Sequence, residues 1–260
     1  MPPARRRLLP DRRQNDTQDL EGAADNGALF VAPMITSPHN DKLKTLRKLQ
    51  RRRDGRFVAE GEDLLAAADA SGWEPLERYV AAGSGLAGTE VEPSVLASVS
   101  QLGSGTRALA VYRERWAPAP AGPLCVALWG LRDPGNVGTV LRSARAFGAS
   151  AVALGPGTAD PYGPKAVRAS MGALFELPVA RVASVAELPG ETIALVARAG
   201  APLQRGVQGP VSVVVGAERE GLPADVVAGC DRVAHIPIAS ESLNAAMAAT
   251  IALYELSREP

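Results

Sequence analysis

The spacing of apolar residues predicts a small α/β domain in the first half of the chain. After Asn40, the residues Leu43, Leu46 and Leu49 recur every three positions, which predicts a helix with one apolar face. Short apolar runs predict strands at 57–59, 76–81 and 109–112, and further helices near 64–70 and 93–96. We therefore predict an α/β domain over residues 34–115.

The second half alternates more regularly between apolar strands and helices. The pattern predicts strands at 124–129, 151–154, 177–181, 192–198, 211–216 and 232–237. It predicts helices at 137–147, 165–173, 184–188, 224–229 and 242–257. Nearly continuous apolar strands separated by helices indicate a mostly parallel sheet with helices on both faces. In such sheets ligands bind at the carboxyl ends of the strands.

Two segments fit neither domain. Residues 1–33 are rich in Arg, Asp, Gln and Pro and have no apolar periodicity before Leu29, which predicts a disordered tail. Residues 116–123 read Trp-Ala-Pro-Ala-Pro-Ala-Gly-Pro and predict an extended linker. We expect this linker to separate the small domain from a larger domain over residues 124–260.

Charge is distributed unevenly, although the 28 basic and 28 acidic residues give a formal net charge of zero. A basic cluster lies between His39 and Arg56, formed by Lys42, Lys44, Arg47, Lys48, Arg51, Arg52, Arg53 and Arg56. Such a cluster indicates contact with RNA or another polyanion. A solvated helix face explains it about equally well.

The remaining composition excludes several classes of protein. Cys125 and Cys230 lie in different segments and imply no disulfide framework. The apolar runs are far too short to span a bilayer. His39 and His235 have no metal-ligand spacing, so we expect no metal, and a cytoplasmic protein is the default expectation.

Three loops at predicted strand ends contain the candidate chemistry. Their residues are Asn136, Gly138 and Arg142; Gly216, Glu218 and Gly221; and Ile236, Pro237, Ser242, Leu243 and Asn244. Each residue alone has an ordinary explanation as a cap, a turn or a surface residue. Asn136 and Ser242 are expected N-caps. In the last helix, Leu243, Met247, Ile251 and Tyr254 form the expected core-facing stripe, and its alanines permit close packing.

Together the loops resemble the three motifs of the SpoU (TrmH) family of SPOUT methyltransferases. These motifs are Asn-x-Gly-x-x-x-Arg, Gly-x-Glu-x-x-Gly, and Ile-Pro followed by Ser-Leu-Asn. The resemblance covers residues 122–258 closely, and residues 36–112 more loosely resemble the family's ribosomal protein L30e-like substrate-binding domain. The segment between Pro237 and Ser242, which includes Ala239, Ser240 and Glu241, is about two residues shorter than in the family.

The resemblance implies a fold and an activity. The fold is an α/β sheet with a deep trefoil knot, preceded by the L30e-like domain, and a homodimer forms through the knotted domain. The activity is methyl transfer from S-adenosylmethionine (AdoMet) to a ribose 2′-hydroxyl of structured RNA. Ribosomal RNA is favoured over transfer RNA, because of the type of N-terminal domain.

The resemblance also implies residue roles. The expected catalytic residues are Asn136, Arg142, Glu218, Ser242 and Asn244. AdoMet is expected to contact Ala197, Gly216, Ile236 and Leu243. From the basic cluster, RNA phosphates are expected to contact Lys42, Lys44, Arg47, Lys48, Arg51 and Arg52. Lys165 and Arg168 are additional candidates, although a solvated helix face explains these two residues equally well. Because arginine keeps its proton at neutral pH, we expect Arg142 to stabilise negative charge or hold a phosphate rather than act as a base.

Two other functions are compatible with parts of this pattern. A catalytically silent RNA-binding protein of the same fold would explain the shorter third loop, but it has no need of five polar site residues. A nucleotide-dependent oxidoreductase is disfavoured, because the chain lacks a Gly-x-Gly-x-x-Gly loop between a strand and a helix.

Overall fold

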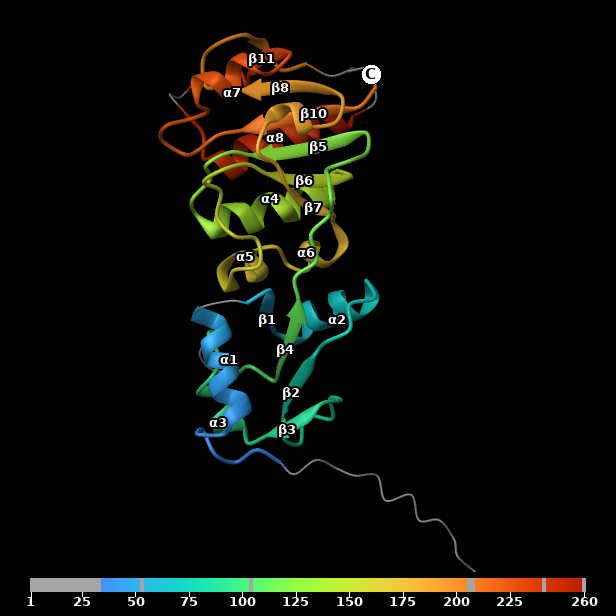
Figure 1. Ribbon diagram of the computed structural model, residues 1–260, viewed down its shortest axis with the longest axis vertical. Helices are drawn as coiled ribbons and strands as arrows, with labels where there is room; N and C mark the ends of the chain where they lie inside the picture. Colours follow the sequence, from blue (N-terminus) through green and yellow to red (C-terminus); the bar gives the residue numbers. More distant parts are fainter. Residues whose placement is uncertain (1–33, 52–53, 103–104, 205–208, 240–241, 259–260) are drawn as a thin grey trace, which may run out of the picture. The chain divides into compact units, whose positions relative to one another are not determined.

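The computed structural model describes residues 34–51, 54–102, 105–204, 209–239 and 242–258. The tail predicted at residues 1–33 lies outside them. The described residues form a four-stranded sheet and a seven-stranded sheet (Figure 1). In this part of the chain, no helix is long and apolar enough to cross a membrane.

The smaller sheet has the strand order β1-β4-β2-β3. Its strands are β1 (Arg56–Glu60), β2 (Glu77–Ala81), β3 (Thr89–Val91) and β4 (Ala108–Arg113), and its helices are α1 (Asp41–Arg51), α2 (Glu62–Ala70) and α3 (Pro93–Ala97). Strand β4 is antiparallel to β1 and β2, and β3 is parallel to β2. The predicted apolar face of α1 is confirmed, because Leu43, Leu46 and Leu49 are buried. Only the short strand β3 was not predicted here.

The larger sheet has the strand order β7-β6-β5-β10-β8-β11-β9, and every pair of neighbours is parallel. Its strands are β5 (Leu124–Leu128), β6 (Ala151–Leu154), β7 (Val179–Arg181), β8 (Glu191–Leu195), β9 (Ala201–Pro202), β10 (Val211–Val215) and β11 (Arg232–His235). The prediction of a parallel sheet is therefore confirmed. The two-residue strand β9 was not predicted.

Helices cover both faces of this sheet. Its helices are α4 (Pro134–Ala146), α5 (Pro164–Ala169), α6 (Ala173–Glu176), the 3-10 helix η1 (Val185–Glu187), α7 (Ala224–Ala228) and α8 (Ala245–Ser257). Alternate residues of β5 face opposite layers, as the two-residue period of a strand requires. Val126 packs in the core with α4 and α8, whereas Ala127 packs with η1 and α7.

The helix predicted at 165–173 is interrupted. Helix α5 ends at Ala169, and α6 begins at Ala173. Between them Met171 and Gly172 have positive φ values of 49° and 92°, which a continuous right-handed helix does not allow. The helix predicted at 184–188 is only a single 3-10 turn, η1, which starts at a capping box formed by Ser184 and Glu187.

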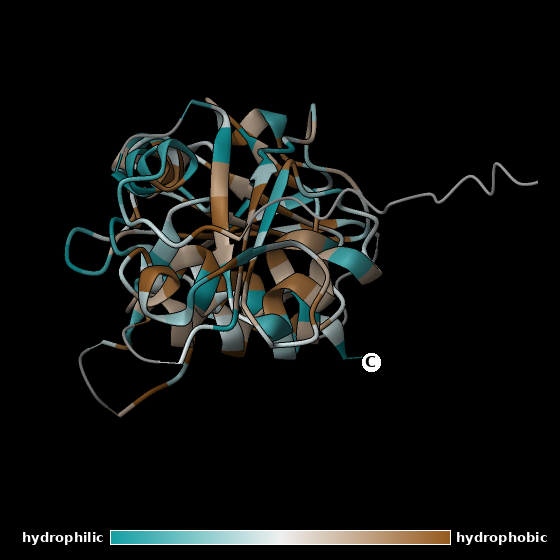
Figure 2. Ribbon diagram, turned by 90° about the horizontal axis from the view of Figure 1, so that it is seen from below, coloured by the Kyte–Doolittle hydropathy of each residue, from teal (hydrophilic) through white to brown (hydrophobic). Residues whose placement is uncertain are grey.

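The core-facing stripe predicted for the last helix is wrong. On α8, Met247, Ile251 and Tyr254 are 59%, 39% and 45% exposed. The buried residues are Ala245, Ala246, Ala249, Ala252 and Leu253. Because α8 packs closely on α4 and the sheet, its inward face consists of alanines and Leu253, and Met247, Ile251 and Tyr254 face outward. The mixture of hydrophilic and hydrophobic turns within single helices is visible in Figure 2.

The segment predicted as a linker has defined contacts. The Ala117 N–H donates to the Val179 carbonyl at 2.8 Å, and Ala117 pairs with Ala180 as an isolated parallel bridge. The segment predicted as a linker is therefore attached to the edge strand β7, which is otherwise unpaired on that side.

Phe57 of β1 and Phe175 of α6 belong to one apolar cluster, and their ring centroids lie 6.0 Å apart.

Candidate active site

A cavity of about 380 Å³ lies at the carboxyl ends of β8, β10 and β11. Its lining includes all four residues expected to contact AdoMet, namely Ala197, Gly216, Ile236 and Leu243. Leu195, Val215, Ile238, Ala245 and Ala248 add apolar surface, and Glu218, Arg219, Glu220 and Ser242 add polar groups. Mostly apolar cavities of a few hundred Å³ with a few polar groups are typical of small-molecule sites.

The loop after β10 folds back on itself at this cavity. Ala217 and Gly221 exchange two backbone hydrogen bonds of 3.1 Å each. A Cβ at Gly216 would clash with the backbone of Gly221 and Leu222, so this fold-back requires glycine. The loop then places Glu218 at the rim of the cavity.

A chain of three side chains joins the candidate loops. Asn136 Nδ2 donates to Glu218 Oε1 at 2.8 Å, and Asn244 Nδ2 donates to Asn136 Oδ1 at 3.3 Å. Asn244 Oδ1 in turn accepts from the backbone N–H groups of Ala246 (2.9 Å) and Met247 (3.2 Å). The structure thus brings together three of the five residues predicted to be catalytic.

The cap of α8 fixes the direction of this chain. A helix N-terminus offers only N–H donors, so Asn244 must present its oxygen to α8 and its amino group to Asn136. Asn136 must then present its oxygen to Asn244 and its amino group to Glu218. The residue that caps α8 is therefore Asn244, and the prediction that Ser242 is the cap is wrong.

Helix α4 is also capped by a different residue than predicted. Asp133, not Asn136, is the N-cap, and its Oδ1 accepts from the Gly135 N–H at 2.8 Å. Lys165 Nζ lies 2.6 Å from the same oxygen. The Lys165 ammonium and the Gly135 N–H hold the pKa of Asp133 below its usual value. With Asp133 as cap, Asn136 lies within the first turn and is free to reach Glu218.

Gly138 allows α4 and α5 to pack closely. A Cβ at this position would clash with the carbonyl oxygen of Ala166 and lie 2.7 Å from Cβ of Ala169. Glycine at position 138 therefore permits a close backbone approach, and the approaching backbone is that of α5.

Arg142 and Ser242 occupy other positions. Arg142 is exposed on α4, and within the described part of the chain no hydrogen bond joins it to Asn136. Six residues correspond to about 600° of helix rotation, so the two side chains point in directions about 120° apart. Ser242 lines the cavity. Ser240 and Glu241 of the shortened loop lie outside the described residues.

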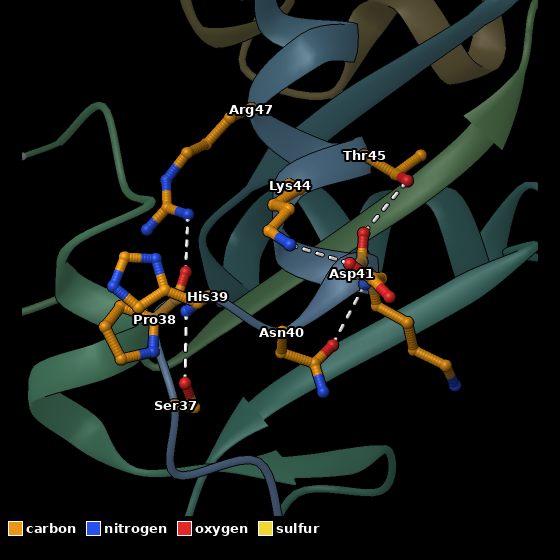
Figure 3. Close-up of polar contacts among 9 residues, drawn as sticks. Ser37, Pro38, His39, Asn40, Asp41, Lys44, Thr45 and Arg47 are labelled. Carbon is orange, nitrogen blue, oxygen red and sulfur yellow. Dashed lines mark hydrogen bonds and ion pairs between the residues drawn. The ribbon is translucent and has the colours of Figure 1, made fainter.

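The predicted RNA-binding helix α1 has two kinds of basic residue. Arg47 donates to the Pro38 carbonyl at 2.7 Å, and Lys44 is paired with Asp41 at 2.8 Å (Figure 3). Arg47 also donates to Ser98 Oγ at 3.1 Å. In contrast Lys42, Lys48 and Arg51 are exposed, and Arg52 lies outside the described residues. Arg47 therefore holds the start of the helix in place, whereas the exposed residues remain available to a ligand.

The two additional contacts predicted on α5 are partly engaged. Lys165 pairs with Asp133, and the Arg168 guanidinium donates to the Gln101 carbonyl at 3.5 Å. Over the described residues, no group of three or more His, Cys, Asp or Glu side chains is placed to hold a metal ion.

Comparison with known sequences shows a family relationship. Residues 123–254 match the model of the SpoU rRNA methylase family. An uncharacterized tRNA/rRNA methyltransferase of Synechocystis sp. is 32% identical over 258 residues, covering 86% of this chain and 93% of that relative. The 23S rRNA (guanosine(2553)-2′-O)-methyltransferase of Bacillus subtilis is 38% identical over 135 residues, covering 48% of this chain and 54% of the relative. The alignment therefore spans only about half of this second relative.

Solved structures show the same relationship. The AdoMet-bound rRNA methyltransferase of Sinorhizobium meliloti superposes with a TM-score of 0.75 and 29% identity, covering 86% of this chain and 96% of that one. The SpoU methyltransferase AviRb of Streptomyces viridochromogenes, in complex with AdoMet, gives a TM-score of 0.74 and 26% identity over 84% and 97% of the two chains.

The parallel sheet, the cavity at its carboxyl edge and these likenesses define an enzyme, an RNA methyltransferase whose methyl donor is AdoMet. More narrowly, the chain belongs to the SpoU rRNA methylase family. The family resemblance seen in the three loops is thereby confirmed.

Proposed function

We propose that the protein transfers a methyl group from AdoMet to a ribose 2′-hydroxyl of structured ribosomal RNA. The observation that supports this most directly is the chain Asn244–Asn136–Glu218, which ends at the rim of the cavity. The relatives from Bacillus subtilis and Streptomyces viridochromogenes are named as 23S rRNA 2′-O-methyltransferases. They favour ribosomal RNA over transfer RNA.

The cavity suits AdoMet chemically. Its apolar wall, which includes Ile236 and Leu243, can contact the adenine, and the backbone near Gly216 offers hydrogen-bonding groups. Glu218 and Arg219 provide charged groups for the amino and carboxylate ends of the methionine part. When bound, AdoMet supplies a methyl group on a positively charged sulfur, which an oxygen nucleophile can attack.

The polar chain positions Glu218 rather than leaving it mobile. Its carboxylate accepts from Asn136, whose amide direction is set by the cap of α8. A carboxylate held at the rim can accept a hydrogen bond from a ribose hydroxyl and so orient its oxygen. Ser242 in the same lining provides a second polar contact. These roles agree with the predicted catalytic set, which remains a prediction.

Arg142 fits a role outside this cavity. Its side chain is exposed on α4, the helix that packs against α8. The outer side of α8 presents Met247, Ile251 and Tyr254 to the surface, as expected for an interface between copies of the chain. In the proposed homodimer Arg142 stabilises charge on RNA bound near this interface. The deep knot and the L30e-like character of the small domain belong to the same proposal.

RNA docking is proposed at the exposed part of the basic cluster. Lys42, Lys48 and Arg51 can contact phosphates, while Arg47 is committed to the Pro38 carbonyl. Phosphate contacts would fix the position of the RNA on the enzyme but not its sequence.

Titration calorimetry of the full chain with AdoMet, with NADH as a control ligand, tests the proposal. We expect micromolar AdoMet binding that Gly216→Val abolishes, because a side chain there clashes with Gly221. The control Ala228→Val also introduces a valine side chain, at an exposed position of α7, and should bind normally. Methyl transfer to a 23S rRNA transcript, located by resistance of the 2′-methylated ribose to alkali, completes the test. A folded protein that binds no AdoMet would favour the silent RNA-binding alternative.

A further inference from the structure

A second cavity, of about 510 Å³, lies at the carboxyl ends of β6 and β7. It is separate from the cavity described above, and the two share no lining residue. Its walls are the loop of residues 155–161, the turn after β7, and Trp116. Its lining includes none of the proposed AdoMet or phosphate contacts.

The cavity contains a planar cation on an aromatic ring. The Cζ atom of Arg181 lies 4.2 Å from the centre of the Trp116 ring. Arg181 is exposed, and no carboxylate pairs with it among the residues that the structure describes. An exposed guanidinium on an indole offers a flat surface to a further planar group.

Trp116 is held in place from several sides. Its Nε1 donates to Glu114 at 3.0 Å, and its ring meets the Tyr162 ring edge to face at 5.1 Å. The following residue, Ala117, is hydrogen-bonded to β7. The flat surface is therefore preorganised, so little side-chain entropy is lost when a ligand binds.

The cavity lies on the same edge of the sheet as the active site. Strands β7, β6, β5 and β10 are consecutive neighbours and all parallel (Figure 1). The Ala159 N–H donates to the Leu131 carbonyl at 2.8 Å, which joins the cavity wall to the loop that leads into α4 and Asn136. At about 4.8 Å between strands, β6 lies roughly 10 Å from β10.

The charges in the lining favour a base over a phosphate. Besides Arg181 the lining contains two carboxylates, Asp160 and Glu187. Asp160 accepts from the Tyr162 N–H at 2.8 Å, and Glu187 accepts from the N–H groups of Ala183 and Ser184 at 2.8 and 2.9 Å. A phosphate would meet these negative groups, whereas a neutral base would stack on Arg181 and meet backbone groups with its edge.

We propose that this cavity binds an unpaired nucleobase of the RNA substrate, which stacks on Arg181 a short distance along the strand from the methylated ribose. The inference rests on the proposed RNA substrate and adds a second point of recognition. Stacking of single-stranded bases on aromatic or guanidinium planes is a common mode of RNA binding. The site thus selects RNA in which a base near the target is unpaired.

The test uses the full chain and a fluorescein-labelled hexa-adenylate, with binding followed by fluorescence anisotropy. Arg181→Ala should weaken binding about tenfold, within the range for loss of one stacked base. Arg181→Lys keeps the charge but not the plane, so it should weaken binding nearly as much. The control Arg113→Ala removes an exposed arginine of β4 and should change the affinity less than twofold. Full rescue by lysine would overturn the stacking assignment.

A second variant and the salt dependence separate the alternatives. Ala183→Phe fills the cavity from an exposed position and should also weaken binding. Arg181→Ala should leave the slope of log affinity against log salt unchanged, because a base contact releases no counterion; a decrease of about one unit would show a phosphate contact and overturn the proposal. If Arg181→Ala also lowers thermal stability and AdoMet affinity in parallel with oligonucleotide affinity, the contact between Arg181 and Trp116 is purely structural. That result would also overturn the proposal.

The outcome can be distinguished from failure of the enzymatic function. If the wild-type chain methylates 23S rRNA but Arg181→Ala has unchanged oligonucleotide affinity, this site alone is refuted. If Arg181 is needed for oligonucleotide binding but the wild type binds no AdoMet, the catalytic proposal is refuted and the base site stands.

Discussion

Asn136 and Glu218, which are 82 residues apart in the sequence, are joined by a hydrogen bond of 2.8 Å in which the amide donates. The amide cannot reverse without losing its second hydrogen bond, to Asn244. A neutral donor at position 136 is therefore matched to a charged acceptor at position 218.

Asn136→Asp should lower kcat for methyl transfer about a hundredfold or more. The substitution keeps the size of the side chain but places a second carboxylate beside Glu218. The repulsion between the two carboxylates displaces the Glu218 side chain. AdoMet affinity should also fall, because the displaced Glu218 is part of the cavity lining. Single-turnover assays with labelled AdoMet measure the effect. The control Gln204→Glu makes the same change from amide to carboxylate at an exposed position and should leave the rate of methyl transfer unchanged. A wild-type rate in Asn136→Asp would refute the catalytic role of the pair Asn136 and Glu218.

Two substitutions at Asn244 should separate helix capping from catalysis. Asn244→Ala should cost about 1 kcal/mol of unfolding free energy, because α8 loses its N-cap, and should also reduce activity. Asn244→Asp keeps a good cap and should retain stability, yet it removes the amide donor to Asn136. Thermal unfolding and methyl transfer measured side by side test this. Full activity in the aspartate variant would show that only the cap matters.

Gly138→Ala should destabilise the protein by about 1–3 kcal/mol, the usual cost of overpacking. The added methyl group would clash with the Ala166 carbonyl of α5, which cannot move without shifting that helix. Gly135→Ala is the matched control on the same helix. Its nearest neighbour is Cε of Lys165 at 2.9 Å, the end of a flexible side chain, so the cost should be small. Urea denaturation midpoints give the comparison, and equal midpoints would contradict it.

The stability contributed by Asp133 should depend on pH in a defined direction. Its folded pKa lies below the usual 3.8, because the Lys165 ammonium and the Gly135 N–H favour the ionised carboxyl group. The contribution is therefore complete above the unfolded pKa and is lost as pH falls through the folded pKa. Asn is also a good N-cap, so Asp133→Asn removes mainly the charge.

The difference in melting temperature between wild type and Asp133→Asn should be small and constant near neutral pH. It should shrink below pH 3.8. It is small because both partners of the ion pair are partly exposed to solvent. A difference that grows on acidification would contradict the assigned direction of the shift.

Ile251→Glu should weaken self-association of the protein. Ile251 lies with Met247 and Tyr254 on the outer side of α8, and a buried unpaired carboxylate would be costly in an interface. Sedimentation velocity measures the shift toward monomer. Leu76→Glu, at another exposed apolar position, is the control. A wild-type chain that is monomeric at all concentrations would refute the proposed homodimer.

The sequence was sufficient for most of the regular elements. The strand at 151–154 has the predicted bounds, and the leucine spacing of α1 corresponds to its buried face. The short strands β3 and β9 were missed because a run of two or three residues is too short to show a clear alternation. For α8, large apolar residues were assigned to the core, but close helix packing selected alanine instead.

The candidate site was predictable in part. All four proposed AdoMet contacts line one cavity, as the family motifs implied. The chain through Asn136 joins residues 82 and 108 positions apart, and no local pattern reports such contacts. The cap Asp133 was missed although a local signal existed, because Asp followed by Pro134 is a usual helix start. Trp116 was treated as part of a linker, and only the fold shows its contact with Arg181.

The cap of α8 also sets an order of events during protein synthesis. A chain that has emerged only as far as Leu222 contains the motif loops around Asn136 and Glu218, but it lacks Asn244, which orients the amide between them. Contacts over more than a hundred residues form late, since their loop-closure entropy must be overcome first. A nascent or truncated chain without α8 is therefore expected to be inactive, which couples competence for methylation to completion of this part of the fold.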